Sequence, residues 1–227
     1  MKVIVTTSNR YVHLLPVFCH LFNTFWGKDQ QVEIVGYKTP TCELPDNFTF
    51  VSLGEQIGGP ENFSTDLRAY FELQDQYVIW CMEDSFFKAP VNHRNIRLAT
   101  QLAIDGMGDP IGRIGLTNDN YKQYDELYGV VDYVNIYKTP QKSEYRLSTQ
   151  PAIWNRDYLL RYMTPGLNPW QFECQEKVED EFLNLCLEKN EAPIVFNEGV
   201  RKWDLYALNL EGIPEEVINE MKELEIL

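Results

Sequence analysis

In the first half of the chain, short apolar runs alternate with segments of helical periodicity. Lys2–Thr6 and Val32–Tyr37 are predicted strands, because both are rich in β-branched residues. Between them, apolar residues recur every three or four positions from Val12 to Trp26, which predicts a helix that Gly27 closes. A strand, a helix and a strand in such close succession predict a right-handed βαβ unit with a parallel sheet.

The same alternation continues toward residue 104. Phe48–Leu53 is a predicted third strand, and a helix through Leu73 follows, with its N-cap in Ser64-Thr65-Asp66. Tyr77–Cys81 is a nearly continuous apolar run, which indicates a central strand buried on both faces. A further helix is predicted over residues 92–104.

The second half has shorter apolar runs separated by polar loops, which indicates a mixed or antiparallel extension of the sheet. The predicted strands are 113–116, 130–137, 145–148 and 193–196, and the predicted helices are 155–163, 179–188 and an amphipathic, acidic one at 214–227. No repeat, low-complexity segment or long linker divides the chain. A single α/β domain over residues 1–227 is therefore predicted.

Charge and cysteine content narrow the classes of partner and compartment. The formal net charge is −14 and no run of Lys and Arg occurs, which disfavours a protein that grips duplex DNA by its phosphates. The five cysteines show no CxxC or Cys/His metal spacing, which indicates free thiols in a reducing compartment. No signal peptide and no apolar stretch of membrane-spanning length is evident. We therefore expect a cytoplasmic protein.

The strongest candidate for chemistry is the acidic pair Glu83-Asp84, directly after the apolar run that begins at Tyr77. In open parallel α/β sheets, ligands bind beyond the carboxyl ends of the strands. A carboxylate there can hold Mg²⁺ or Mn²⁺, which neutralises a diphosphate leaving group. The alternative is a polar turn that only ends the strand.

A second candidate is the loop Thr6-Thr-Ser-Asn-Arg10, at the exit of the first strand. Its hydroxyls, amide and guanidinium suit a nucleobase, a ribose or a phosphate. The chain has neither GxGxxG nor GxxxxGK[ST], so neither a dinucleotide site nor a P-loop is indicated. The alternative is an ordinary strand-to-helix turn in which Ser8 or Asn9 caps the helix.

A third candidate combines Trp154, Trp170 and Glu173, which are flanked by proline turns. Tryptophan faces stack on sugar rings, and a partly shielded glutamate is a suitable general base. The alternative is that both tryptophans are core residues and Glu173 caps a helix. Paired-carboxylate glycoside hydrolysis by Glu83, Asp84 and Glu173 also stays open, whereas the absence of GxSxG disfavours a serine hydrolase.

Four segments together resemble small GT-A-type glycosyltransferases of the kind found in bacterial polysaccharide loci and phage genomes. These segments are VIVTTSNR, YVIWCMEDSFF, LSTQPAIWNRDYLL and PGLNPWQFE. The resemblance spans about residues 2–203 and is loose over 106–142. It implies a Rossmann-like, GT-A-like, mainly parallel sheet flanked by helices. It also implies a nucleotide-sugar half at about 1–110 and an acceptor half at about 111–210.

The resemblance also implies roles for individual residues. The nucleotide-sugar, with a UDP-sugar as first choice, would lie near Thr6, Ser8, Asn9, Arg10, Asp66, Asp84 and Arg201. Asp84 and Glu83 would hold Mn²⁺ or Mg²⁺, and Glu173 would be the base of an inverting transfer to a hydroxyl. Trp154 and Trp170 would bind the acceptor. The sequence reads Glu-Asp-Ser where well-known members have Asp-x-Asp, which puts metal dependence in question.

Two acceptors are compatible with the resemblance, and one rival function remains. The acceptor is a saccharide or glycolipid, or a hydroxymethylated base in phage DNA. The second would need a local basic groove, for which the candidates are Lys122, Lys138, Lys142, Arg146, Arg156 and Arg161. The rival is a non-catalytic nucleotide-sugar- or carbohydrate-binding protein with a degenerate metal motif.

Overall fold

The computed structural model describes residues 1–106, 108–117, 126–176, 179–201 and 204–227. Contacts divide the chain into two compact units. Unit 1 comprises Met1, Gln56–Trp80 and Asn92–Pro193, and unit 2 comprises Lys2–Glu55, Cys81–Val91 and Ile194–Leu227. The segments of the two units interleave along the chain, so neither unit is a continuous stretch of sequence.

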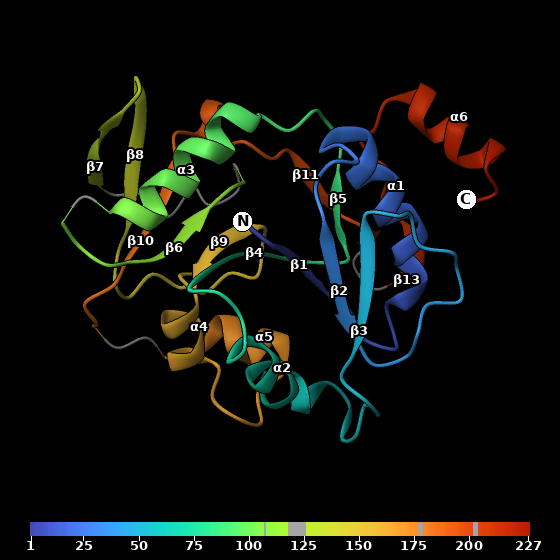
Figure 1. The fold of residues 1–227 in the computed structure, drawn as a ribbon, viewed down its shortest axis with the longest axis horizontal. Helices are drawn as coiled ribbons and strands as arrows, with labels where there is room; N and C mark the ends of the chain where they lie inside the picture. The colour runs from blue at the N-terminus through green and yellow to red at the C-terminus, as the bar shows by residue number, and fades with distance from the viewer. Residues whose placement is uncertain (107, 118–125, 177–178, 202–203) are drawn as a thin grey trace. The chain divides into compact units, whose positions relative to one another are not determined.

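Unit 2 contains the predicted βαβ start (Figure 1). Strands β1 (Val3–Thr6), β2 (Val32–Gly36) and β3 (Phe48–Ser52) are parallel and lie in the order β3-β2-β1. A 3₁₀ turn, η1 (Val12–Leu14), leads into helix α1 (Leu15–Phe25), which joins β1 to β2. The predicted strands and helix of this region are therefore confirmed.

Later segments complete unit 2. Strand β5 (Ser85–Phe87) pairs antiparallel with β11 (Phe196–Glu198), and β12 (Val200–Arg201) pairs antiparallel with β13 (Asp204–Leu208). Helix α6 (Glu215–Glu223) follows. The core of unit 2 is aromatic, with ring centroids 5.1 to 6.1 Å apart among Phe18, Phe22, Trp26, Phe48 and Phe87.

Unit 1 contains the rest of the sheet strands. In spatial order these are β4 (Tyr77–Met82), whose last two residues belong to unit 2, β9 (Ala152–Asn155), β6 (Ile111–Gly115), β10 (Leu183–Leu187), β8 (Val134–Thr139) and β7 (Glu126–Val131). β6 and β10 are parallel, and the other neighbouring pairs are antiparallel. The predicted α/β class with a mixed sheet is confirmed.

Helices accompany these strands in unit 1. They are α2 (Phe63–Phe71), α3 (His93–Asp105), α4 (Arg156–Tyr162) and α5 (Pro169–Cys174), with 3₁₀ turns η2 (Gly59–Asn62) and η4 (Lys189–Glu191). A second aromatic cluster forms the core, from Phe63, Phe71, Trp80, Trp154 and Phe172.

Five predictions of local structure are wrong. Of the predicted strand 193–196, only Phe196 belongs to a strand, as the first residue of β11. Residues 179–188 contain strand β10 rather than a helix; all five of its residues are buried, and in a short apolar run periodicity does not separate strand from helix. Residues 130–137 are a hairpin that turns at Asp132-Tyr133, both with positive φ, rather than one strand. Residues 145–148 form turns rather than a strand. The N-cap of α2 is Asn62, because the Ser64 hydroxyl donates to the carbonyl of Thr164 instead.

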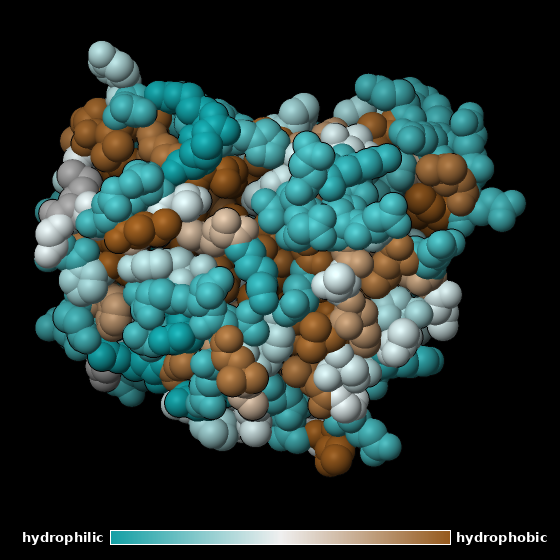
Figure 2. All heavy atoms as spheres, in the orientation of Figure 1, coloured by the Kyte–Doolittle hydropathy of each residue, from teal (hydrophilic) through white to brown (hydrophobic). Residues whose placement is uncertain are grey.

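The surface carries many polar side chains. Figure 2 shows hydrophilic residues over much of the face in view, interrupted by smaller hydrophobic groups. Large hydrophobic side chains that are more than half exposed include Trp170 and Tyr133. In the described part of the chain, no helix is both long and apolar enough to cross a membrane.

Candidate functional site

The acidic pair and the opening loop meet within unit 2. Glu83 follows β4 and is 1% exposed. Its backbone N–H donates to the carbonyl of Thr6 over 3.3 Å. Its Oε1 accepts from the Thr7 hydroxyl over 3.0 Å and from the Ser8 N–H over 3.4 Å. The exits of β1 and β4 therefore present their polar groups to each other.

The Glu83 carboxyl has an unusual electrostatic environment. Burial raises its pKa to about 8, and the negative charge of Asp84 adds to this, whereas the backbone and Thr7 and Ser8 hydrogen bonds oppose it. Its Oε2 is buried and has no hydrogen-bond partner among the described residues. An unsatisfied buried polar atom costs about 1–3 kcal/mol. A cation or a hydrogen-bond donor from a ligand would relieve that cost.

Asp84 is half-buried, and its backbone fixes the turn into β5. Its carbonyl accepts from the N–H groups of Phe86, over 3.0 Å, and of Gly199. A Cβ on Gly199 would lie 2.7 Å from the Phe86 ring, and a Cβ on Gly36 would lie 2.6 Å from Cγ2 of Thr7. Both glycines thus permit close packing beside the acidic pair.

Other predicted loop residues occupy different environments. The Asn9 side-chain oxygen accepts from the Lys38 N–H over 3.0 Å, which ties the loop to the residues after β2. Arg10 is exposed, and its guanidinium lies 5.7 Å from the centre of the Tyr11 ring. Burial raises the pKa of Tyr11, Arg10 opposes this, and Asp84 and Glu83 raise it further, so Tyr11 is within electrostatic range of the acidic pair. Thr6 is buried in β1 and contributes its carbonyl.

Sequence reasoning included Thr7 in the candidate loop without giving it a role of its own, and it missed Tyr11, Gly36 and Gly199. The available signals were the alternation of side chains at the end of β1 and isolated glycines in predicted strands and turns. Arg201 lies in β12, where its backbone is opposite that of Asp204 in β13. The Arg201 side chain falls outside the described part of the chain, so its predicted phosphate contact stays a prediction.

Glu173 belongs to unit 1 and is held by one residue of a distant loop. Both the N–H and the hydroxyl of Thr149 donate to Oε1 of Glu173, the hydroxyl over 2.7 Å. Helix α5, which carries Glu173, begins with a capping box in which Asn168 and Gln171 bond reciprocally. Glu173 therefore does not cap a helix, and its carboxylate has a defined orientation.

The two predicted acceptor tryptophans have opposite environments. Trp170 is 63% exposed, and its ring centroid lies 6.4 Å from that of Tyr145. Trp154 is 0% exposed, stacked against Tyr158 with the Arg113 guanidinium 5.2 Å from its ring. The prediction that Trp154 binds the acceptor is wrong, because a fully buried ring has no face to offer.

Asp66 and the expected basic groove also belong to unit 1. Asp66 is half-buried in the first turn of α2. Four of the proposed groove residues form ion pairs, namely Lys142 with Glu179 at 3.6 Å, Arg146 with Asp180 at 3.2 Å, Arg156 with Asp157 at 3.2 Å and Arg161 with Glu181 at 2.7 Å. Lys138 is half-buried in β8, and Lys122 lies outside the described residues. Carboxylates therefore neutralise most of the expected groove.

A metal ion has a limited set of protein ligands here. Within the described ranges, no group of three or more His, Cys, Asp or Glu side chains is placed to hold a metal. Glu83 and Asp84 provide two hard oxygen donors, and the unsatisfied Oε2 of Glu83 is one of them. Such a pair fits Mg²⁺ or Mn²⁺ that takes its remaining ligands from a substrate diphosphate and water.

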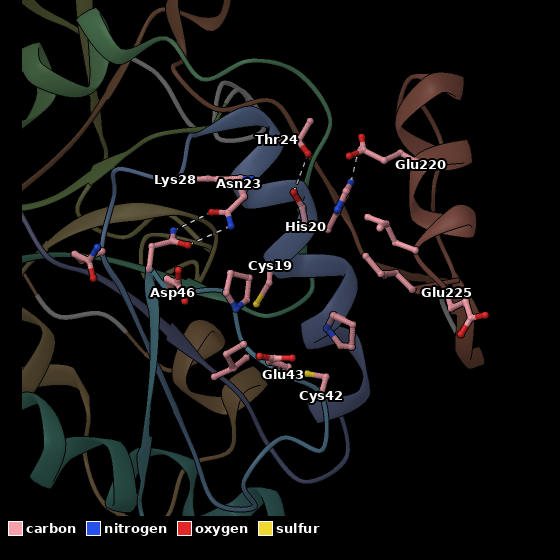
Figure 3. Close-up of a pocket in the computed structure, with 17 residues that line it drawn as sticks. Cys19, His20, Asn23, Thr24, Lys28, Cys42, Glu43, Asp46, Glu220 and Glu225 are labelled. Atoms are coloured by element: carbon pink, nitrogen blue, oxygen red, sulfur yellow. Dashed lines mark hydrogen bonds and ion pairs between the residues drawn. The ribbon is translucent and has the colours of Figure 1, made fainter.

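A separate cavity of about 970 Å³ lies between α1, the loop after β2 and α6 (Figure 3). His20 of α1 points toward Glu220 of α6, with Nε2 3.8 Å from the carboxylate, and burial lowers the pKa of His20. None of the sequence-predicted site residues lines this cavity. It is therefore distinct from the acidic site.

No family model and no curated protein matches the chain. Among solved structures, the galactosyltransferase LgtC in complex with donor and acceptor sugar analogues is 14% identical, with a TM-score of 0.38 over 71% of this chain and 60% of that one. An active-site mutant of LgtC is 13% identical, with a TM-score of 0.36 over 71% and 59%. The chain thus spans about 60% of the length of these proteins. At such TM-scores the likeness is too distant to support an argument about fold or activity.

Proposed function

We propose that this chain is a glycosyltransferase that moves a sugar from a nucleotide-sugar to a hydroxyl acceptor with inversion. One observation carries the proposal. Glu83, directly after β4, is buried beside Asp84, with one oxygen bonded to Thr7 and Ser8 and the other without a partner among the residues that the structure describes. This arrangement suits a cation that arrives with a diphosphate.

The donor side would be formed by the loop after β1 and the acidic pair. Asp84 would hold Mg²⁺ or Mn²⁺ together with Glu83, whose carboxyl would release its proton as the cation binds. The cation would neutralise the charge of the departing diphosphate. The Tyr11 ring, beside Arg10, offers a surface on which a nucleobase can stack. A UDP-sugar is the first donor to test.

The reaction itself needs one general base on the protein. The acceptor oxygen would bond to the anomeric carbon, the bond from that carbon to the diphosphate oxygen would break, and its electron pair would leave with the nucleoside diphosphate. The hydroxyl proton would pass to the Glu173 carboxylate and from there to water. The bonds from Thr149 to Glu173 support this role, because they fix the carboxylate in one orientation.

The test is a thermal-shift screen of UDP-sugars with and without Mn²⁺, followed by a donor hydrolysis assay. We expect a UDP-sugar with Mn²⁺ to raise the melting temperature, because a ligand that binds only the folded state stabilises it. Asp84→Ala should abolish hydrolysis, whereas Asp75→Ala, which removes an exposed carboxylate, should not.

Each outcome of this test bears on the proposal. If neither nucleotide-sugars nor metal shift the melting temperature, the proposal falls. Binding without hydrolysis or transfer, unchanged by Asp84→Ala, would identify the chain as a non-catalytic binding protein instead.

A further inference from the structure

We propose that Tyr145 and Trp170 form the acceptor subsite and that it takes an uncharged pyranose ring of a saccharide rather than a base in DNA. This inference rests on the proposed function, since it assigns the acceptor for the base Glu173. Tyr145 is a new assignment, and it replaces the buried Trp154 as the second aromatic residue of the subsite.

Helix α5 displays Trp170 and Glu173 together. Residues three apart in a helix lie on the same face, so an acceptor stacked on Trp170 lies next to Glu173. Phe172, between them in sequence, is 0% exposed and packs against Trp80 and Phe63. The buried Phe172 therefore fixes the helix while Trp170 stays 63% exposed.

Tyr145 is presented to Trp170 by a well-anchored turn. The Ser148 N–H donates to the carbonyl of Tyr145 over 3.0 Å. The next residue, Arg146, is 1% exposed, bonds both carboxylate oxygens of Asp180 and donates to the carbonyl of Phe182. Because these bonds fix the position of Arg146, the adjacent Tyr145 and its partner Trp170 are preorganised before any ligand binds.

The same turn region also reaches Glu173. Thr149 lies at its end and donates both of its hydrogen bonds to Glu173. The Glu144 carboxylate raises the pKa of the Tyr145 hydroxyl, and burial, Cys174 and Glu173 contribute further, so Glu173 lies within electrostatic range of Tyr145. The loop 144–149 and α5 thus bring two aromatic rings and a carboxylate into one place.

Both sugars and nucleobases stack on aromatic rings, so stacking alone does not distinguish a saccharide acceptor from a DNA acceptor. The charge around the subsite does. DNA brings a negative charge with every nucleotide, and it needs free cations nearby. Around the subsite, Lys142 is paired with Glu179 and Arg146 is buried against Asp180. Glu144 and Glu173 would repel phosphates, whereas they do not oppose a neutral sugar.

The test measures acceptor kinetics and acceptor binding separately from donor chemistry. The probes are methyl and octyl glycosides of glucose, galactose, mannose and N-acetylglucosamine, and a DNA duplex that contains 5-hydroxymethylcytosine. The variants are Trp170→Ala and Tyr145→Ala, with Trp170→Phe as a conservative rescue and Tyr133→Ala as a control that removes a fully exposed ring elsewhere. Melting curves check that each variant folds.

We expect Trp170→Ala to raise the KM of a glycoside acceptor by about tenfold or more, whereas the control Tyr133→Ala should leave that KM unchanged. Tyr145→Ala should have a smaller effect in the same direction, and Trp170→Phe should restore most of the loss. Octyl glycosides with a lower KM than methyl glycosides would indicate a lipid-linked saccharide, and equal values a free one; either result supports the assignment.

The outcomes against the assignment are distinct from failure of the proposed function. Transfer to the DNA duplex but to no glycoside would overturn it, as would a KM that Trp170→Ala leaves unchanged. If the protein hydrolyses no donor, the proposed function fails, and saturation-transfer NMR then decides the subsite alone. If the unmodified protein and Tyr133→Ala give glycoside signals and Trp170→Ala does not, the saccharide subsite is supported. If the unmodified protein gives no glycoside signal, the subsite is wrong.

Discussion

The hydroxyl of Thr7 donates a hydrogen bond to Oε1 of Glu83 over 3.0 Å, between residues separated by 76 positions in the sequence. The bond joins the loop after β1 to the residue after β4. It leaves the second carboxylate oxygen of Glu83 buried beside Asp84 and without a hydrogen-bond partner in the described ranges. The donor-side proposal depends on that oxygen, and so does the first prediction.

Glu83→Gln should change how stability depends on pH. The folded-state pKa of Glu83 is raised to about 8, so the stability it contributes is fully present below its unfolded pKa and is lost as pH rises through about 8. A glutamine stays neutral throughout. We expect the urea midpoint of the unmodified protein to fall relative to the variant between about pH 5.5 and about pH 8.5.

The control for this measurement is Glu55→Gln, which removes an exposed carboxylate of the same unit. The urea midpoint of Glu55→Gln should change with pH in parallel with that of the unmodified protein. Parallel profiles for Glu83→Gln as well would show that Glu83 is ionised in the folded protein at neutral pH, contrary to the prediction.

Glu173→Gln should reduce sugar transfer by at least about 10²-fold, the usual scale for a lost general base. The shift in melting temperature caused by the donor should stay as it is, because the substitution is isosteric and the proposed donor ligands are elsewhere. Thr149→Val, which removes one hydrogen bond to Glu173, should reduce transfer less severely. Transfer kinetics and thermal shift on the same preparations check both statements, and unchanged transfer in Glu173→Gln would remove this residue from the mechanism.

Gly199→Ala should disturb the acidic pair without touching its side chains. The new Cβ would lie 2.7 Å from the Phe86 ring, and the Gly199 N–H bonds the carbonyl of Asp84, so the Asp84 backbone must move. Overpacking of this kind costs about 1–3 kcal/mol. We expect a lower urea midpoint and weaker donor binding. The double variant with Phe86→Leu should recover part of the stability; if it does not, the steric explanation is wrong.

Asp180→Ala should be strongly destabilising, by about 3–5 kcal/mol, because it leaves the Arg146 guanidinium buried without its counter-charge. The substitution also removes the acceptor of the Tyr162 hydroxyl. Replacing the pair together, with Arg146→Met and Asp180→Leu, should cost less than Asp180→Ala alone. Glu181→Ala, which breaks the exposed pair with Arg161, serves as the control and should leave the urea midpoint nearly unchanged.

The sequence predicted the parts of this molecule that follow from local pattern. Residues 12–26 read as a helix because their apolar positions repeat at helical spacing, and α1 buries those positions. The location of Glu83 also followed from pattern, since two acidic residues directly after an apolar run indicate the end of a buried strand. The contact of Glu83 with Thr7 could not be predicted, because it depends on how the exits of β1 and β4 come together in space.

Burial on both faces removes the signal on which sequence reasoning depends. In strand β10, Leu alternates with Asn184 and Cys186, but all five residues are buried. The short alternation therefore marks no exposed face, and residues 179–188 are wrongly predicted as a helix. Trp154 and Trp170 are the same residue type, yet one is buried and the other exposed. Only the packing of β9 against α4 and α5 separates core from surface at these positions.

The interleaving of the two units has a consequence for biosynthesis. Unit 2 begins with Lys2–Glu55 but takes β11, β13 and α6 from Ile194–Leu227. During synthesis, β1, β2 and β3 emerge before Ile194–Leu227, so unit 2 is incomplete until that segment has been made. Residues 56–193 emerge in between and provide nearly all of unit 1. Unit 1 can therefore fold before the segment that completes unit 2 has been synthesised.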